Sequence, residues 1–270
     1  MTDMSSASRP SVPGIDTTIP HSARVWNYWL GGKDNYEVDR KAGDAFLEVY
    51  PGIRDIARVS RYWLARVVRH LAGEAGVRQF LDIGTGLPTV DNTHQIAQTV
   101  APDSHIVYVD NDPLVLTHAR ALLTSSPEGA TDYIDADVHD PDRILDAAAK
   151  TLDFSRPVAV MLIGILGHVQ DCDEGRSIVA RLLEPLPSGS YLALYDGTDT
   201  DEVYVTATAT YNGSGGVPYN LRSPERIASF FEGLDLVEPG VVELSTWRPE
   251  ASPLGAPRPV PAWGGVGRKP

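Results

Sequence analysis

Five short runs rich in apolar residues, spaced through the middle of the chain, constrain the fold more than any other feature of the sequence. They cover residues 79–83, 105–109, 131–135, 157–163 and 191–195, and most are nearly continuous rather than alternating. Strands of that kind are buried on both faces, which is typical of a parallel sheet with helices on either side. The pattern therefore predicts an α/β, Rossmann-like fold with a doubly wound, mostly parallel sheet.

Helices are expected before and between these strands. Residues 54–71 carry apolar side chains at helical spacing with arginines between them, which predicts an amphipathic helix. Gly73 and Gly76 are expected to end it. Further helices are expected up to about residue 100, from an Asp112 cap and Pro113 to residue 123, from Asp140-Pro141, and over 173–183.

The C-terminal part of the chain is expected to complete the sheet. Ser223-Pro224 suits the start of a helix, residues 234–244 suit a strand, and a last apolar segment surrounds Trp263. We expect these last two segments to form an antiparallel hairpin that closes a seven-stranded sheet. Residues 213–216, Gly-Ser-Gly-Gly, are expected to form a flexible loop.

Charge and composition exclude several classes of protein. The 23 Lys and Arg residues stand against 36 Asp and Glu, a formal net charge of −13, so we expect no nucleic-acid partner. The single cysteine, Cys172, rules out an intrachain disulfide and a cysteine-based zinc cluster. No run approaches the ~18 apolar residues of a membrane helix, and residues 1–20 lack the apolar core of a signal peptide. We therefore predict a cytoplasmic protein that does not associate with membranes.

A glycine turn and two acids follow successive strands. Gly84 and Gly86 follow the first strand, Asp110 ends the second, and Asp137 with Val138 follows the third. In an open α/β sheet, ligands bind at the carboxyl ends of the strands. Glycines there let backbone N–H groups approach a ligand, and an acid about 20 residues further on suits the hydroxyls of a ribose. Asp137 suits an adenine amino group, so the ordered set predicts a cofactor that contains adenosine.

Three features favour S-adenosylmethionine over NAD as that cofactor. Pro88 stands where a dinucleotide fingerprint has the glycine that lets a helix approach a pyrophosphate, a group that S-adenosylmethionine lacks. Asp82 precedes the first glycine and suits the ammonium group of the cofactor. About 80 residues precede the turn, whereas a dinucleotide domain commonly opens with it. Two alternatives remain open: a non-catalytic S-adenosylmethionine-binding protein, and an NAD-dependent oxidoreductase, which Pro88 disfavours.

A longer resemblance supports the same interpretation. Residues 22–40, Ser-Ala-Arg-Val-Trp-Asn-Tyr-Trp-Leu-Gly-Gly-Lys-Asp-Asn-Tyr-Glu-Val-Asp-Arg, resemble the N-terminal signature of an actinobacterial family of S-adenosyl methyltransferases. Residues 82–89 and 108–113 resemble that family too, and the sheet segment is similar to class I S-adenosylmethionine-dependent methyltransferases. The chain departs from the usual class I glycine loop at Leu87-Pro88. The resemblance implies methyl transfer from S-adenosylmethionine, with S-adenosylhomocysteine as the product.

The resemblance also implies how the site is divided. Asp82, Gly84 and Gly86 would line the methionine end of the cofactor, Asp110 the ribose, and Asp137 with Val138 the adenine. We expect a flexible tail over 1–20, an N-terminal helical lid over 21–53 and a class I methyltransferase domain over 54–270. The predicted cofactor-binding residues are Tyr28, Gly32, Lys33, Tyr36, Asp82, Gly84, Thr85, Gly86, Asp110, Asn111, Asp137, Val138 and Gly164.

The aromatic N-terminal segment has two interpretations. Its aromatic residues can simply pack a short helix against the sheet. Alternatively, residues 31–36 form a lid over the cofactor, with the glycines as a hinge. In that case Tyr28 or Tyr36 faces the sulfonium, because aromatic faces attract cations, and Lys33 pairs with the cofactor carboxylate.

The predicted catalytic group is a base near the fourth strand. His168 follows the apolar run of that strand, although it also suits a buried histidine bonded to a backbone carbonyl. Asp196, after the fifth strand, is a second candidate. No metal-ligand spacing is present, so no metal is expected. We expect a small-molecule acceptor, bound between residues 204–219 and the lid.

Overall fold

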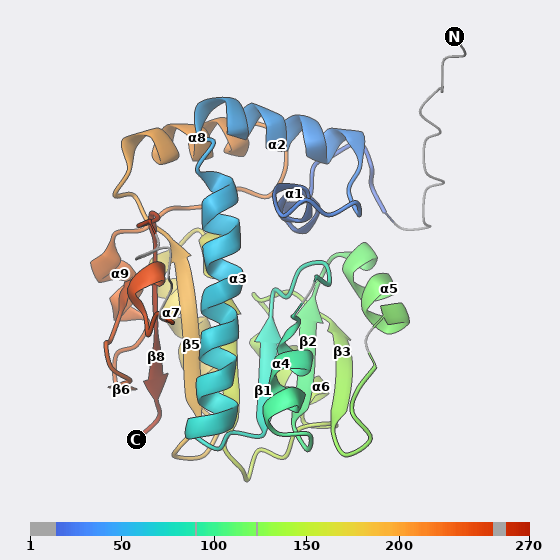
Figure 1. The fold of residues 1–270 in the computed structure, drawn as a ribbon, viewed down its shortest axis with the longest axis vertical. Coiled ribbons are helices and arrows are strands. Elements are labelled where there is room, and N and C mark those ends of the chain that lie inside the picture. Colours follow the sequence, from blue (N-terminus) through green and yellow to red (C-terminus); the bar gives the residue numbers. More distant parts are fainter. Residues whose placement is uncertain (1–14, 90, 123, 251–257) are drawn as a thin grey trace.

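The computed structural model describes residues 15–89, 91–122, 124–250 and 258–270, and its centre is one eight-stranded sheet (Figure 1). The strand order is β3-β2-β1-β4-β5-β8-β6, with β7 paired to β8. The strands are β1 (Gln79–Ile83), β2 (His105–Asp110), β3 (Ala130–Asp135), β4 (Ala159–Ile163), β5 (Tyr191–Gly197), β6 (Asp235–Leu236), β7 (Val242–Glu243) and β8 (Ala262–Arg268).

The first five strands confirm the predicted parallel sheet. β1 pairs in parallel with both β2 and β4, so the strand order reverses between them. That reversal leaves a crevice at the carboxyl ends of β1 and β4, which is where open α/β sheets bind ligands. The fold therefore places the glycine turn after β1 at the position where a ligand site is expected.

The C-terminal hairpin is confirmed in outline, but its first strand is not the single strand that was predicted over 234–244. That segment contains two short strands, β6 and β7, which both pair antiparallel with β8. Pro239 and Gly240 separate them: proline has no N–H for a sheet ladder, and Gly240 has a positive φ of 91°. The break raises the strand number from seven to eight.

Helices cover both faces of the sheet, as predicted. Phe80 and Ile106 point to the face covered by α3 and α4, while their neighbours Leu81 and Val107 point to the face covered by α6, α7 and α9. The helix expected over 54–71 begins one residue earlier and continues into a π-helical turn, His70–Glu74. The helices are α1 (Ser22–Trp29), α2 (Glu37–Val49), α3 (Ile53–Arg69), α4 (Thr93–Val100), α5 (Pro113–Leu122), α6 (Pro141–Ala148), α7 (Cys172–Leu183), α8 (Glu202–Asn212) and α9 (Pro224–Ser229).

Three helices lie over the carboxyl ends of the strands. Figure 1 shows α1 above β1 and β2, with α2 and α8 side by side above it. Asp201 caps α8, with its carboxylate accepting hydrogen bonds from two backbone N–H groups of the first turn. Helix propensity does not predict α8, because its many Val, Thr and Tyr residues are weak helix formers. Its buried face consists of Tyr204, Ala207, Thr208 and Tyr211, at helical spacing.

Some predictions fall on residues outside the described ranges. Residues 1–14 of the expected flexible tail, 1–20, lie outside these ranges. Residue 123, the expected end of α5, lies outside them too. In the described part of the tail, the backbone carbonyls of Asp16 and Ile19 accept hydrogen bonds from the Arg24 side chain. Asp112 Oδ1 accepts a hydrogen bond from Leu114 N at 2.8 Å, which fits the predicted cap of α5.

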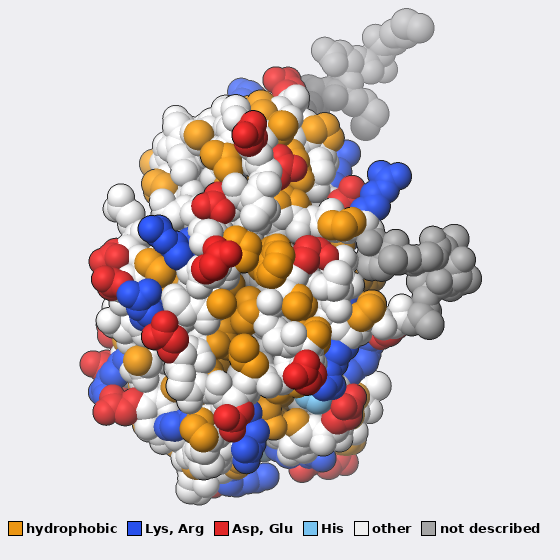
Figure 2. All heavy atoms as spheres, turned by 90° about the vertical axis from the view of Figure 1, so that its left-hand side faces the viewer, with side chains coloured by type: hydrophobic (Ala, Val, Ile, Leu, Met, Phe, Trp, Pro, Cys, Tyr) orange, Lys and Arg blue, Asp and Glu red, His pale blue; other side chains and the backbone are white. Residues whose placement is uncertain are grey.

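The surface over the β6–β8 edge has mixed charge. Figure 2 shows Lys and Arg side chains interspersed with Asp and Glu on this face, with hydrophobic side chains between them. This face therefore has no concentrated basic patch of the kind that binds phosphate backbones. No helix in the described part of the chain is both long enough and apolar enough to span a bilayer.

Candidate functional site

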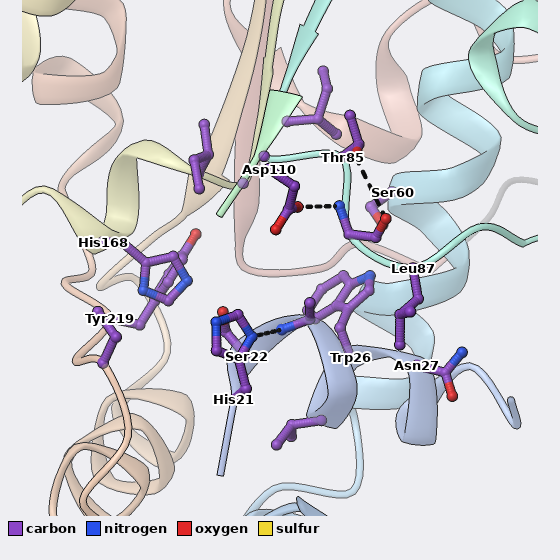
Figure 3. Close-up of a pocket in the computed structure, with 18 of the residues that line it drawn as sticks. His21, Ser22, Trp26, Asn27, Ser60, Thr85, Leu87, Asp110, His168 and Tyr219 are labelled. Atoms are coloured by element: carbon purple, nitrogen blue, oxygen red, sulfur yellow. Dashed lines mark hydrogen bonds between the residues drawn. The ribbon is translucent and has the colours of Figure 1, made fainter. Parts of the chain in front are cut away.

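A cavity of about 250 Å³ lies at the carboxyl ends of β1, β2, β4 and β5. Figure 3 shows Thr85 and Asp110 on one wall, His21 and Trp26 of α1 facing them, and His168 with Tyr219 at one side. Of the predicted site residues, ten line this cavity: Asp82, Gly84, Thr85, Gly86, Asp110, Asn111, Asp137, Val138, Gly164 and His168.

The loop after β1 has a backbone that requires glycine at two positions. Gly84 and Gly86 have positive φ angles of 73° and 65°, which favour glycine. A Cβ at Gly84 would lie 2.6 Å from the Ile165 side chain, so the loop packs tightly there. A Cβ at Gly86 would meet no atom within 4 Å. The loop at Gly86 therefore leaves space beside its backbone, on the wall of the cavity.

The Asp110 carboxylate joins this loop to the end of β2. Oδ2 accepts a hydrogen bond of 2.8 Å from Gly86 N, and Oδ1 accepts one of 2.9 Å from Asp112 N. Burial raises the pKa of Asp110, and the two backbone hydrogen bonds oppose that rise. Each carboxylate oxygen has a second lone pair, so Asp110 can still accept a hydroxyl from a ligand.

Asn111 and Asp137 form a pair across the ends of β2 and β3. Asn111 Nδ2 donates to Asp137 Oδ2 at 2.8 Å, and His139 N donates to Asp137 Oδ1 at 3.0 Å. Burial raises the pKa of Asp137, but hydrogen bonds from His139 and Asn111 outweigh it and leave the pKa below its usual value. Asp137 is therefore an ionised hydrogen-bond acceptor at neutral pH.

Asp82 is a buried carboxylate at the end of β1. Its Oδ2 accepts a hydrogen bond of 2.6 Å from Thr93 Oγ1. Burial raises the pKa of Asp82 to about 6, although the Thr93 hydrogen bond and the Arg61 guanidinium both favour the charged form. Arg61 also lines the cavity. The site thus contains a carboxylate and a guanidinium close together, which suits the ammonium and carboxylate groups of an amino acid.

Four predicted residues of the N-terminal segment, Tyr28, Gly32, Lys33 and Tyr36, do not line the cavity. Tyr28 OH donates to Asp44 Oδ1 at 2.6 Å, on the side of α1 that faces α2. The Tyr36 ring instead packs with the small cluster around Leu87, under the Arg24 guanidinium at 5.4 Å.

The turn between α1 and α2 is organised around Asn27. The Asn27 side-chain oxygen accepts hydrogen bonds of 3.0 Å from Asp34 N and from Asn35 Nδ2. A Cβ at Gly32 would lie only 2.3 Å from Asn27 Nδ2, so Gly32 permits close packing of the turn. Gly32 therefore has a structural explanation in the turn itself.

Three residues that line the cavity, His21, Trp26 and Arg61, are not among the predicted site residues. His21 Nδ1 lies 3.0 Å from Asp112 Oδ2, which ties the start of α1 to the loop after β2. Trp26 belongs to the aromatic N-terminal segment, and Arg61 is one of the arginines on the amphipathic helix. Nothing in the local sequence distinguishes Arg61 from the exposed Arg58 on the same helix.

His168 is oriented by a backbone contact. Its Nδ1 lies 2.9 Å from the Pro218 carbonyl oxygen, which can only accept, so Nδ1 carries the proton. The ring packs edge-on against Tyr219, with centroids 5.1 Å apart. Burial lowers the pKa of His168, so the ring is neutral at pH 7. Nε2 is therefore an unprotonated nitrogen at the cavity, as a general base requires.

Asp196, the second candidate base, does not line the cavity. It is fully buried, and its Oδ1 accepts hydrogen bonds from Gly167 N at 3.1 Å and Tyr219 OH at 3.0 Å. Its Oδ2 lies 3.6 Å from Arg222 Nη1. Asp196 thus holds the loops that carry His168 and Tyr219. Within the described ranges, no group of three or more His, Cys, Asp or Glu side chains is arranged to hold a metal ion.

These residues fit S-adenosylmethionine. The space beside the Gly86 backbone, where even a Cβ would meet nothing, provides room for a ligand against the glycine loop. Asp82 and Arg61 lie at the part of the cavity nearest α3, while Asn111 and Asp137 lie at the ends of β2 and β3. Groups that suit an amino acid therefore lie on one side of Asp110, and groups that suit a nucleoside lie on the other side.

Comparison with known proteins identifies close relatives. A family model described as S-adenosyl methyltransferase matches residues 8–270. The crystal structure of a DUF574 family protein from Streptomyces avermitilis is 49% identical, covers 94% of this chain and 99% of that chain, and superimposes with a TM-score of 0.90. A protein from Thermobifida fusca, described as a candidate methyltransferase, is 42% identical over 95% of this chain and 97% of that chain, with a TM-score of 0.86.

More distant structures share the fold alone. An S-adenosylmethionine-dependent methyltransferase from Anabaena variabilis is 13% identical, covers 97% of this chain and 100% of that chain, and has a TM-score of 0.50. A search of curated proteins finds no match to this chain.

Proposed function

As the chain belongs to the S-adenosyl methyltransferase family and is an S-adenosylmethionine-dependent methyltransferase, we propose that its cavity binds this cofactor together with a small-molecule acceptor. Residues of α1 and α8 line the side of the cavity that lies over the strand ends. This favours an acceptor small enough to enter beneath the two helices. Family membership also favours S-adenosylmethionine over the nicotinamide alternative.

The residues at the strand ends have separate roles in this proposal. The glycine loop, Asp82 and Arg61 hold the methionine end of the cofactor, and Asp110 accepts the ribose hydroxyls. Asn111 and Asp137, with the Val138 side chain, hold the adenine. When bound, S-adenosylmethionine supplies a methyl group activated by its positively charged sulfur. The remaining task of the protein is to align the acceptor and to accept its proton.

The proposal that the protein accepts a proton from the methyl acceptor depends on one observation, the tautomer of His168. Because Pro218 O fixes the proton on Nδ1, Nε2 is free to accept the proton of an acceptor hydroxyl or amine. The burial that lowers the pKa of His168 keeps this nitrogen unprotonated at neutral pH. A general base in such a position contributes on the order of 10²–10⁴ in rate.

A label-transfer experiment tests the proposal. Methyl-labelled S-adenosylmethionine is incubated with the protein and a library of phenols, alcohols and amines, and labelled products are counted. His168→Gln should bind S-adenosylhomocysteine within twofold of the unchanged protein, yet transfer label at least 100-fold more slowly. His105→Gln is the matched control, since His105 lies at the opposite end of β2 and should alter neither property.

Three outcomes would contradict the proposal in different ways. Binding of NAD in place of S-adenosylhomocysteine would refute the cofactor site. Binding of S-adenosylhomocysteine without label transfer to any library member would refute a small-molecule acceptor of these classes. Equal transfer by His168→Gln and the unchanged protein would remove His168 as the base.

A further inference from the structure

The cavity has a second part that the cofactor residues do not explain. Beyond the strand ends, under α1, α2 and α8, its walls are the buried aromatic side chains of Trp29, Phe46, Tyr204 and Tyr211, with Trp26 at the edge. We call this part the aromatic chamber. It lies on the side of the cavity formed by helices, whereas Asp82, Asp110 and Asp137 lie on the side formed by strand ends.

From this chamber we infer the chemical class of the acceptor, an inference that rests on the proposed function. The structure assigns an uncharged aromatic compound that is methylated on a hydroxyl or amino group.

The walls of the aromatic chamber contain no charge that would balance a charged acceptor. Within the described ranges, the Asp, Glu, Lys and Arg side chains that line the cavity are those of Arg61, Asp82, Asp110 and Asp137, and the three carboxylates lie on the side formed by strand ends, away from the chamber. Arg61 lies close enough to favour the charged form of Asp82, and its Nη2 donates to Asp91 O at 2.8 Å. A carboxylate or ammonium group in the aromatic chamber would therefore lose its hydration without gaining an ionic partner, which is unfavourable.

The rings in the chamber are arranged for contact with another ring. The Phe46 ring centroid lies 5.0 Å from that of Trp29 and 6.0 Å from that of Tyr204, with tilted or edge-on geometry. Such spacing is typical of favourable aromatic pairs. A further planar ring beside these side chains would meet the same faces and edges, so the chamber favours an aromatic acceptor.

The transfer step balances with the groups named. With a phenolic acceptor, the O–H gives its proton to His168 Nε2, and an oxygen lone pair forms the new C–O bond to the methyl carbon. The C–S bond breaks with its electron pair remaining on sulfur. The products are a methyl ether, S-adenosylhomocysteine and a protonated His168, which releases its proton to water.

Binding of matched naphthalene probes to the full chain, loaded with S-adenosylhomocysteine, tests the inference by calorimetry. 2-Naphthol should bind at least tenfold more tightly than 2-naphthoate or naphthalen-2-ylmethylammonium. This preference corresponds to the uncharged walls of the aromatic chamber.

Two matched leucine variants locate the probe. Leu30 is half-buried and lines the cavity, whereas Leu47 is half-buried in the same helical region and does not. Leu30→Trp should weaken 2-naphthol binding at least tenfold and leave S-adenosylhomocysteine affinity within twofold, while Leu47→Trp should change neither.

The results separate the inference from the proposed function. If S-adenosylhomocysteine does not bind, the proposed function fails and the inference fails with it. If it binds but a charged probe matches 2-naphthol, or Leu30→Trp behaves like Leu47→Trp, the inference alone is overturned.

Discussion

Asp110 Oδ2 accepts a hydrogen bond of 2.8 Å from Gly86 N, which joins the loop after β1 to the end of β2. Two segments separated by an entire helix thereby form one wall of the cavity. The contact also orients the carboxylate, because Asp112 N fixes its other oxygen. A ligand that binds along the strand ends therefore meets a preformed hydrogen-bond acceptor.

Asp110→Asn should weaken S-adenosylhomocysteine binding at least tenfold. The amide can still accept from Gly86 N, but its NH₂ group then faces Asp112 N–H, and one acceptor for the ribose is lost. Isothermal titration measures the change. Asp103→Asn is the control, because Asp103 is exposed and pairs with Arg78 at 3.1 Å near the start of β2. Equal affinities of the two variants would contradict the ribose role of Asp110.

Cofactor affinity should depend on pH through Asp82. Its pKa is about 6 in the folded protein, and only the ionised carboxylate attracts the ammonium group of the cofactor. The dissociation constant should therefore be level above pH 7 and rise by up to about tenfold per pH unit below pH 6. Asp82→Asn should bind more weakly and lose this part of the pH dependence. An unchanged titration in the variant would exclude Asp82 from the site.

The stability of the ligand-free protein should change with pH in the opposite direction. Burial raises the pKa of Asp82 from 3.8 to about 6, so the folded state binds more protons than the unfolded state between these values. Its contribution to the free energy of unfolding therefore falls as pH rises from 4 to 6, by on the order of 3 kcal/mol. Denaturant titrations of the protein and of Asp82→Asn measure this difference, which should be constant above pH 7. A difference that grows with pH between 7 and 8 would contradict it.

Gly32→Ala should destabilise the fold. The new Cβ would overlap the Asn27 amide, and displacing that amide breaks its hydrogen bonds to Asp34 and Asn35. We expect a loss of about 1–3 kcal/mol in the free energy of unfolding. Gly213→Ala is the control: its Cβ would meet no atom closer than 3.4 Å, so its effect should stay within about 0.5 kcal/mol. Equal effects would argue against the role of Asn27 in the turn.

Lys33→Ala and Tyr28→Phe should leave S-adenosylhomocysteine affinity within twofold, because neither residue lines the cavity. Trp26→Ala, on the other face of α1, should weaken binding of 2-naphthol in the protein loaded with S-adenosylhomocysteine. Calorimetry on the three variants separates the two faces of this helix. A tenfold loss of S-adenosylhomocysteine affinity in Lys33→Ala would restore the lid interpretation of residues 31–36.

Local sequence predicted the features that depend on neighbours in the chain. The strands that carry Asp82 and Asp110, and the glycine turn between them, follow from apolar runs and from residues that permit a tight turn. Their convergence also follows from sequence, because parallel strands bring their carboxyl ends to one edge. Pro239 interrupts the segment 234–244 in the sequence too, but the apolar residues on either side of it favoured one continuous strand.

Tertiary packing decided which side of each helix faces the cavity. Aromatic residues occur on both faces of α1, so their spacing did not distinguish Trp26 from Tyr28. That choice is made by α2, where Gly43 lets the Tyr28 ring approach and turns Trp26 to the opposite side. Likewise, Arg61 lies at the site because of where its turn of α3 meets the strand ends. Sequence by itself determined the sheet and its row of strand-end residues, because these are local. Only the folded structure determined which side chains of α1, α2 and α8 face the cavity, because helix rotation is set by contacts between segments that are distant in the chain.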